Sequence, residues 1–278
     1  MSRVAGKVCV VTGAASGIGR ALAVELAERG ASGIAISDVN EEGLAETAAL
    51  LTGVKVDSAV LDVADREAFI AYAARVAEEF GVVHQIYNNA GVGDSGSIDE
   101  LDYRRLDRII GINLWGVIHG TKEFLPHLIA SGDGHVTNVS SLNGILAQAE
   151  MSGYCTTKFG VRGFTESVAL DMKAKRLPVG VSVVHPGGIK TEIANAALAS
   201  APEYGVEVTA EMEARNRLYN DRLLRMPPSK AAEIIVNGVE SDRGRIMVGN
   251  DARMLDGLVR LLPSRWPAIT GRLEKLLG

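Results

Sequence analysis

The segment Thr12-Gly13-Ala14-Ala15-Ser16-Gly17-Ile18-Gly19 lies between a short apolar run and a stretch of helical composition. The apolar run Lys7-Val8-Cys9-Val10-Val11 predicts a buried β-strand. Residues 20–29 are rich in Ala, Leu and Glu and predict a helix that ends at Gly30. A strand, a glycine-rich turn and a helix in this order are typical of folds that bind dinucleotides.

The three glycines of this segment have separate tasks in the predicted turn. The spacing is G-x-x-x-G-x-G, which differs from the commoner G-x-G-x-x-G. Gly13 permits a tight turn, Gly17 lets the backbone approach a pyrophosphate, and Gly19 lets the helix pack close to the strand. We therefore expect the turn, with Ser16 and Ile18 between its glycines, to hold the phosphates of a dinucleotide at the helix N-terminus.

An acidic residue follows the second predicted strand. The apolar run 33–37 ends at Asp38, nineteen residues after Gly19. A carboxylate at about this distance binds the ribose 2′-hydroxyl and repels a 2′-phosphate. Its sequence neighbours carry no positive charge. Asp38 therefore favours NAD over NADP, although an Asp here can also cap a helix that begins at Glu41.

Apolar runs recur along the chain, with helical stretches between most of them. The runs contain Val8, Ile34, Val56, Val83, Val136, Val181 and Ile246. Strands that alternate with helices predict an α/β protein with a doubly wound parallel β-sheet (a Rossmann fold) and helices on both faces. We expect one such domain over residues 1–250, followed by a C-terminal extension over residues 251–278.

Tyr154 and Lys158 are four residues apart in a predicted helix, and Tyr154 comes thirteen residues after Ser141. Side chains at this spacing lie on one face of the helix, one turn apart. A free Tyr has a pKa of about 10, and a neighbouring ammonium favours its phenolate. With the Ser141 hydroxyl to hold a substrate oxygen, the three residues suit proton transfer to or from an alcohol or ketone.

Together, these motifs resemble those of the short-chain dehydrogenase/reductase family. The likeness runs from about Gly6 to about Gly249. The glycine turn resembles the family's T-G-x-x-x-G-x-G, and residues 138–141 resemble its N-h-S-S, in which the second serine is catalytic. Two neighbouring positions depart from the family pattern: His84 stands where Asp is common, and Tyr87 where a small aliphatic residue is usual.

The resemblance implies a role for each catalytic residue. Tyr154 would be the general acid/base, Lys158 would lower its pKa and hold the nicotinamide ribose, and Ser141 would position the substrate oxygen. The backbone carbonyl of Asn113 would hold a water of the proton relay. The cofactor would supply the hydride chemistry, and these residues the orientation and the proton transfer.

The resemblance also implies further contacts with the cofactor. The pair Asp62-Val63 would contact the adenine, the segment 88–91 (N-N-A-G) would stabilise the sheet beside the cofactor, and residues 186–191 (P-G-x-x-x-T) would contact the nicotinamide. The expected cofactor-binding residues are Gly13, Ser16, Gly17, Ile18, Gly19, Asp38, Asp62, Val63, Asn89, Ala90, Gly91, Tyr154, Lys158, Pro186, Gly187, Ile189 and Thr191.

Two segments are expected to shape the substrate pocket. By resemblance, residues 191–228 form a substrate lid, which would exclude water during hydride transfer; a plain pair of surface helices is the alternative. Residues 251–278 mix apolar and basic side chains. We expect this extension to cover the cleft or to pack against another subunit, with a peripheral membrane helix as the alternative.

Composition excludes several classes of protein. The net charge of −5 argues against a nucleic-acid partner, which requires a basic face. Two cysteines cannot build a disulfide framework, and the N-terminus lacks the apolar region of a signal peptide, so we expect a cytoplasmic protein. No apolar run approaches 18 residues, which predicts no membrane span. The five histidines have no metal-ligand spacing, so no metal is expected.

The sequence thus predicts an NAD-dependent oxidoreductase that interconverts a secondary alcohol and a ketone. The substrate is expected to be a small, apolar molecule, which the sequence does not identify. An NADPH-dependent ketone or 3-oxoacyl reductase is one alternative, which Asp38 disfavours. A non-catalytic NAD-binding sensor or scaffold is another, but a sensor would have no need of Ser141, Tyr154 and Lys158.

We also expect a homo-oligomer, either a tetramer or a dimer. By resemblance, two long helices over residues 101–129 and 151–175 pair with those of a second copy. Their apolar side chains exceed what one sheet face can bury. The positions concerned are Leu106, Ile110, Leu114, Val117, Phe164 and Val168.

Overall fold

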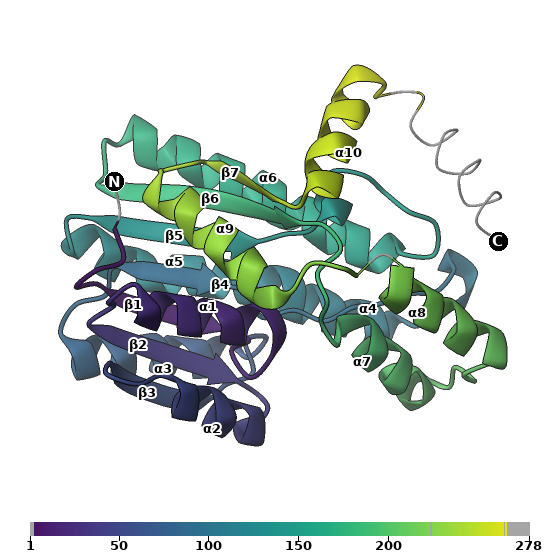
Figure 1. Ribbon diagram of the computed structural model, residues 1–278, viewed down its shortest axis with the longest axis horizontal. Helices are drawn as coiled ribbons and strands as arrows, with labels where there is room; N and C mark the ends of the chain where they lie inside the picture. The colour runs from purple at the N-terminus through teal and green to yellow at the C-terminus, as the bar shows by residue number, and fades with distance from the viewer. Residues whose placement is uncertain (1–2, 223, 264, 266–278) are drawn as a thin grey trace.

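The structure is a computed structural model that describes residues 3–222, 224–263 and 265 (Figure 1). Within these residues, seven parallel strands form one sheet in the order β3-β2-β1-β4-β5-β6-β7. The strands are β1 (Val8–Thr12), β2 (Gly33–Asp38), β3 (Lys55–Val60), β4 (Gln85–Asn88), β5 (Gly134–Val139), β6 (Val179–Pro186) and β7 (Arg245–Val248). The predicted doubly wound Rossmann fold is confirmed.

The strand order reverses between β1 and β4. The chain moves outward from β1 to β2 and β3, then returns to place β4 on the other side of β1. At such a reversal the connections leave in opposite directions and open a crevice at the carboxyl ends of the strands, where ligands of these folds bind. The glycine turn after β1 and the N-N-A-G segment after β4 therefore lie side by side.

Helices cover both faces of the sheet (Figure 1). One face carries α1 (Gly17–Glu28), α2 (Glu41–Leu50) and α9 (Pro228–Glu240), and the other carries α3 (Arg66–Phe80), α5 (Gly116–Ala130) and α6 (Ser152–Ala174). Alternate residues of a strand point to opposite faces, so Cys9 and Val11 pack under α1 while Val10 joins the opposite cluster. Both sides of the sheet are thus buried, as its nearly continuous apolar strands require.

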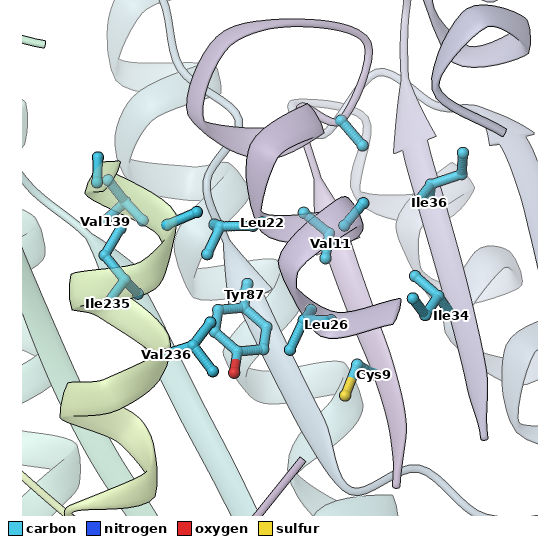
Figure 2. Close-up of a cluster of buried hydrophobic side chains, with 14 of the residues drawn as sticks. Cys9, Val11, Leu22, Leu26, Ile34, Ile36, Tyr87, Val139, Ile235 and Val236 are labelled. Carbon is cyan, nitrogen blue, oxygen red and sulfur yellow. The ribbon is translucent and has the colours of Figure 1, made fainter. Parts of the chain in front are cut away.

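Tyr87 fills the core between β4 and the helices α1 and α9. Figure 2 shows its ring beside Leu26 and Val236. The phenol is fully buried, and its hydroxyl donates to Oε1 of Gln85 at 2.8 Å. A buried Tyr is tolerated where its hydroxyl finds a partner, and this hydrogen bond provides the partner for Tyr87.

The predicted helix over residues 101–129 is present as a continuous helical segment with a π-helical turn inside it. It consists of α4 (Tyr103–Ile110), a π-helical turn (Gly111–Trp115) and α5. The π-helical turn widens the helix where the Asn113 side chain bonds to the backbone of Val92, and such turns often occur at functional sites. The predicted helix over residues 151–175 is present as α6.

The remaining elements lie at or beyond the carboxyl edge of the sheet. The region predicted as a lid contains α7 (Ile193–Ser200) and α8 (Ala210–Arg222), which project away from the strands (Figure 1). The extension begins with α10 (Asn250–Leu261), and its residues 264 and 266–278 lie outside the described residues. Short 3₁₀ turns span Ile98–Glu100, Leu142–Gly144 and Ala201–Tyr204. No helix in the described part of the chain is both long and apolar enough to cross a membrane.

Candidate active site

The turn after β1 has no room for side chains at its glycines. Gly13 has a φ of +68° and Gly17 a φ of +53°, a region that favours glycine. A Cβ at Gly13 would lie 2.6 Å from the Cα of Ala90, and one at Gly19 would overlap the carbonyl oxygen of Gly13. The backbone at Gly13 and Gly19 therefore packs directly against neighbouring backbone. A compact glycine turn at the start of α1 suits phosphate binding.

The segment after β4 fixes this turn in place. The Asn89 side chain donates to the carbonyl oxygens of Thr12 at 3.1 Å and Gly13 at 3.2 Å. In return, the Thr12 hydroxyl accepts from the amides of Asn89 and Ala90, both at 3.1 Å. These four hydrogen bonds connect the two predicted cofactor-binding segments into one rigid edge.

Asp38 lies at the end of β2 and faces the glycine turn. Its Oδ2 accepts from the amide of Ala15 at 3.0 Å, and its Oδ1 accepts from the amide of Asn40 at 3.1 Å. The side chain of Asn40 caps α2 by accepting from the amide of Gly43 at 3.0 Å. The alternative role of Asp38 as the cap of this helix is therefore wrong, because Asn40 performs it.

A cation that the sequence did not indicate lies near this carboxylate. The Arg20 guanidinium bonds to the carbonyl oxygen of Ala15, whose amide Asp38 holds. It also donates to Oγ1 of Thr47 at 2.9 Å and pairs with Glu46 at 2.6 Å. Arg20 comes four residues after Ser16, so the turn of the helix brings it back to the start of the segment. Its positive charge is already paired with Glu46.

The predicted adenine-contacting pair lies on the same edge of the sheet. The Asp62 carboxylate accepts from the amide of Ala64 at 2.9 Å, and the amide of Leu61 donates to the carbonyl of Asp38 at 2.9 Å. Val63 is buried. The structure therefore brings Asp62 and Val63 beside the end of β2, next to Asp38.

Lys158 is buried beside Tyr154 on α6. Its Nζ lies 5.7 Å from the centre of the Tyr154 ring and donates to the carbonyl oxygen of Val139 at 3.2 Å. The Lys158 side chain is 3 % exposed, and burial lowers its pKa to about 8. A Lys in these surroundings is still mostly protonated at pH 7, so an ammonium lies close to the phenol, as the sequence predicted.

The two adjacent serines at the end of β5 have different partners. The Ser140 hydroxyl is buried and donates to the carbonyl oxygen of Lys158 at 2.8 Å. Ser141 is half-buried and accepts from the amide of Asn143 at 3.1 Å. Ser140 thus joins the strand to α6, whereas the hydrogen bond at Ser141 uses the hydroxyl oxygen as an acceptor and does not involve its proton. This difference supports the choice of Ser141 as the substrate-binding serine.

Asn113 reaches the same region from the π-helical turn. Its Oδ1 accepts from the amide of Val92 at 2.8 Å, and its Nδ2 donates to the carbonyl of Val92 at 2.9 Å. A Cβ at Gly91 would lie 3.2 Å from Oδ1 of Asn113 and 3.4 Å from Nζ of Lys158. The structure thus brings Asn113, Gly91 and Lys158 together, with both polar ends of the Asn113 side chain engaged.

His185 supports Ser141 from behind. Its Nδ1 lies 2.8 Å from the carbonyl oxygen of Ser141, and the ring is fully buried at the end of β6. Burial lowers the pKa of His185 to about 4, so the ring is neutral near pH 7. A neutral ring can bond to a carbonyl only by donating Nδ1–H. His185 therefore holds the backbone of the predicted catalytic serine by donating to its carbonyl.

The loop over residues 186–191 (the 186–191 loop) closes the other side of the crevice. The Cγ2 of Thr191 would lie 3.2 Å from a Cβ at Gly17, so the two ends of the predicted cofactor site meet. Ile189 is buried and forms an isolated bridge with Met226, at the end of the region predicted as a lid. The amide of Gly187 donates to the carbonyl of Val248 at 2.9 Å.

The region predicted as a lid contacts the segment after β4 and the segment before α6. A Cβ at Gly93 would lie 3.0 Å from the carbonyl oxygen of Ile193 in α7, and Arg215 of α8 pairs with Glu150 at 2.7 Å. The Tyr204 ring lies 5.8 Å from the guanidinium of Arg105. Both helices are therefore attached to the entrance of the crevice. In the described residues, no group of three or more His, Cys, Asp or Glu side chains could hold a metal ion.

Comparison with known proteins agrees with this geometry. The model of the short chain dehydrogenase family matches residues 7–201. SadH of Mycobacterium tuberculosis, named as an oxidoreductase, is 46 % identical over 268 residues, which cover 96 % of this chain and 94 % of SadH. A C alpha-dehydrogenase of a Sphingobium species is 35 % identical over 241 residues, or 85 % of this chain and 78 % of that protein.

A solved structure is similar over almost the whole chain. The crystal structure of a short chain dehydrogenase/reductase from Burkholderia phymatum, in complex with NAD, matches with a TM-score of 0.86 at 29 % sequence identity. The match covers 96 % of this chain and 96 % of that one. The match therefore covers a larger share of this chain than residues 7–201, which the family model matches.

Proposed function

Because the chain belongs to the short-chain dehydrogenase family, we propose that this oxidoreductase interconverts a secondary alcohol and a ketone with NAD as its cofactor. The observation that carries the proposal is the buried Lys158 ammonium, 5.7 Å from the ring of Tyr154 and bonded to the end of β5. A positive charge here favours the phenolate, so that Tyr154 can exchange a proton with a substrate oxygen near neutral pH.

The other residues complete the proton transfer and the orientation. Ser141 donates a hydrogen bond to the substrate oxygen, and His185 keeps its backbone in place. The Asn113 side chain fixes the segment after β4 beside Lys158. Its backbone carbonyl holds the water of the proton relay. A bound nicotinamide dinucleotide supplies the hydride acceptor or donor. The glycine turn fits the phosphates of such a cofactor, because it has no side chain at Gly13 or Gly19, where a Cβ would meet backbone atoms.

A screen of alcohols tests the proposal. We expect the purified protein to reduce NAD with at least one secondary alcohol in a panel of aliphatic, cyclic, steroid and hydroxyacyl compounds, followed by NADH absorbance. Activity only with NADPH and a ketone or 3-oxoacyl compound would favour the reductase alternative. Tight NADH binding without turnover of any compound would favour the sensor alternative.

Cofactor preference is the first quantitative prediction. The Asp38 carboxylate and the 2′-phosphate of NADP are both negative. Two like charges about 4 Å apart at an effective dielectric near 20 repel by about 4 kcal/mol. Half of this repulsion would favour NAD over NADP more than tenfold. We therefore expect kcat/KM to favour NAD over NADP by more than about tenfold. Arg20 does not remove this repulsion, because Glu46 and Thr47 already engage it.

A matched pair of variants tests the role of Asp38. Ser37 is fully buried, so a phosphate-binding Arg has to be placed at Val39, which is 65 % exposed. The double variant Asp38→Ala with Val39→Arg should shift the preference toward NADP, whereas Val39→Arg alone, which keeps the carboxylate, should shift it much less. Equal preference ratios in the wild type and the double variant would show that Asp38 does not set the specificity.

Assembly gives a second prediction, a homotetramer or at least a homodimer. Among the apolar residues expected at the interface, Val117 is buried within the chain itself and Val168 packs against its core. The same helices instead expose Trp115 to 51 %, Phe159 to 40 % and Leu170 to 67 %. We propose that this apolar surface binds a second copy.

Light scattering at micromolar concentration measures the assembly. The wild type should be a dimer or tetramer, and the double variant Trp115→Glu with Phe159→Glu should shift it toward monomer, because buried charges oppose association. Val60→Glu, at an apolar side chain that is 61 % exposed on the edge strand β3, is the control and should not change the mass. A monomeric wild type would refute the proposal.

A further inference from the structure

The carboxylate of Asp251 lies among three glycines at the ends of β6 and β7. Its Oδ2 accepts from the amide of Gly188 at 2.8 Å. A Cβ at Gly187 or at Gly249 would overlap the same carboxylate. Gly249 also has a φ of +112°, which other residues rarely adopt. The backbone on both sides is therefore shaped to let this side chain reach the 186–191 loop.

Asp251 is one of two connections that hold the middle of this loop. On the other side, the carbonyl of Gly188 accepts from the amides of Arg225 and Met226, both at 3.1 Å. The amide of Lys190 donates to the carbonyl of Met226 at 2.8 Å. Gly188 is thus bonded to the end of the lid region through its carbonyl and to the extension through its amide.

The hydrogen bond that Asp251 accepts from the Gly188 amide joins a backbone N–H to a charged group. A hydrogen bond from a backbone amide to a carboxylate is charge-assisted, and it is about twice as strong as one between neutral groups. Asp251 lies in the first turn of α10, where a negative charge is also favourable for the helix. The position of the carboxylate is therefore fixed by the helix that carries it, and the loop is held against a rigid element.

We propose that Asp251 is a positioning residue for the nicotinamide half of the cofactor, so that the first turn of the C-terminal extension is part of the active site. The inference rests on the proposed function, which assigns the 186–191 loop to the nicotinamide. Without the carboxylate, the Gly188 amide loses its partner and the loop samples other conformations. Binding of the nicotinamide must then restore the order of the loop, and this reduces affinity.

The adenosine half of the cofactor provides an internal control. By the proposed function it binds at the glycine turn and Asp38, at the ends of β1 and β2, whereas Asp251 contacts the ends of β6 and β7. ADP-ribose contains the adenosine and both phosphates but no nicotinamide. A residue that positions only the nicotinamide loop should affect NADH and leave ADP-ribose unchanged, whereas general damage to the fold should weaken both.

Binding measurements on four proteins test the inference without any substrate. The proteins are the wild type, Asp251→Ala, Asp251→Asn and Asp256→Ala. Asn keeps an oxygen that can accept from Gly188, and Asp256 is an acidic residue of the same helix that pairs instead with Arg245 at 2.8 Å. NADH binding is followed by its fluorescence, and ADP-ribose binding by competition or calorimetry.

We expect Asp251→Ala to weaken NADH binding by about tenfold, the effect of one lost hydrogen bond to a charged group. ADP-ribose binding should stay at the wild-type value, Asp251→Asn should recover most of the NADH affinity, and Asp256→Ala should bind both ligands like the wild type. Amide hydrogen exchange of Gly188 should be faster in Asp251→Ala than in Asp251→Asn, because only Ala lacks the acceptor.

Other outcomes would overturn the inference. Unchanged NADH affinity in Asp251→Ala, an equal loss of NADH and ADP-ribose binding, or no recovery with Asn would each exclude a positioning role. A wild type that bound ADP-ribose but not NADH would overturn the proposed function, and the role of Asp251 with it. The two failures are therefore distinguishable in the same experiment.

Discussion

Replacing Tyr154 by Phe is expected to lower turnover by at least about 100-fold, the usual effect of losing a general acid/base. The substitution removes the titratable oxygen and keeps the ring, which is almost fully buried on α6. Because the ring still fills its place, NADH affinity should change little. The effect should therefore fall on kcat and not on cofactor binding.

A second tyrosine provides the control for this measurement. Tyr103 is 80 % exposed at the start of α4, and Tyr103→Phe should leave kcat unchanged. Steady-state kinetics with the best alcohol from the screen, combined with NADH fluorescence titration, measures both quantities. Near-normal turnover by the Tyr154→Phe variant would show that another group transfers the proton.

Replacing Lys158 by Met should abolish most activity and make the protein more stable. Turnover should fall by at least about 100-fold, because the phenol loses the charge that favours its ionised form. Burial lowers the pKa of Lys158 from 10.5 to about 8. This lower pKa corresponds to an unfavourable free energy of about 3 kcal/mol for burying the charge. The Met variant, which buries no charge, should have a free energy of unfolding higher by up to this amount at pH 7.

The pH dependence of this difference follows from linkage. Below pH 8 the lysine is charged in both the folded and the unfolded protein, so the full cost is present. As the pH rises from about 8 to 10.5, the folded protein releases its proton first and the cost disappears. The stability gain of Lys158→Met should therefore be largest at neutral pH and small near pH 10.5.

Denaturant unfolding of the cofactor-free protein at several pH values measures this gain. Lys122→Met, at an exposed lysine of α5, is the control and should change stability little at any pH. A Lys158→Met variant that was inactive and also less stable at pH 7 would mean that the hydrogen bond to Val139 outweighs the cost of burying the charge.

Local sequence was sufficient to predict much of the fold and the location of the site. The glycine spacing in residues 13–19 carries its own structural reason, since a Cβ at Gly13 or Gly19 would meet backbone. Tyr154 and Lys158 share one helix, so their proximity follows from helical geometry. Asp38 comes directly after a buried apolar run, so the sequence places it at the carboxyl end of its strand.

What the sequence did not indicate depends on contacts between distant segments. Asp251 reaches Gly188 across 63 positions, and no local pattern marks that approach. Arg20 pairs with Glu46 of α2, a contact that depends on the packing of α1 against α2. Val117 is buried by contacts within the chain, although the family resemblance and the excess of apolar side chains assigned it to the subunit interface.

Isotope transfer tests the central claim most directly. A secondary alcohol that is a substrate is prepared with deuterium on its carbinol carbon and incubated with the wild-type protein and NAD, and the reduced cofactor is analysed by mass spectrometry. We predict that the deuterium appears in NADH, and that the Tyr154→Phe variant transfers it at least about 100-fold more slowly. A protein that binds NADH and yet transfers no deuterium from any alcohol in the panel would contradict the account.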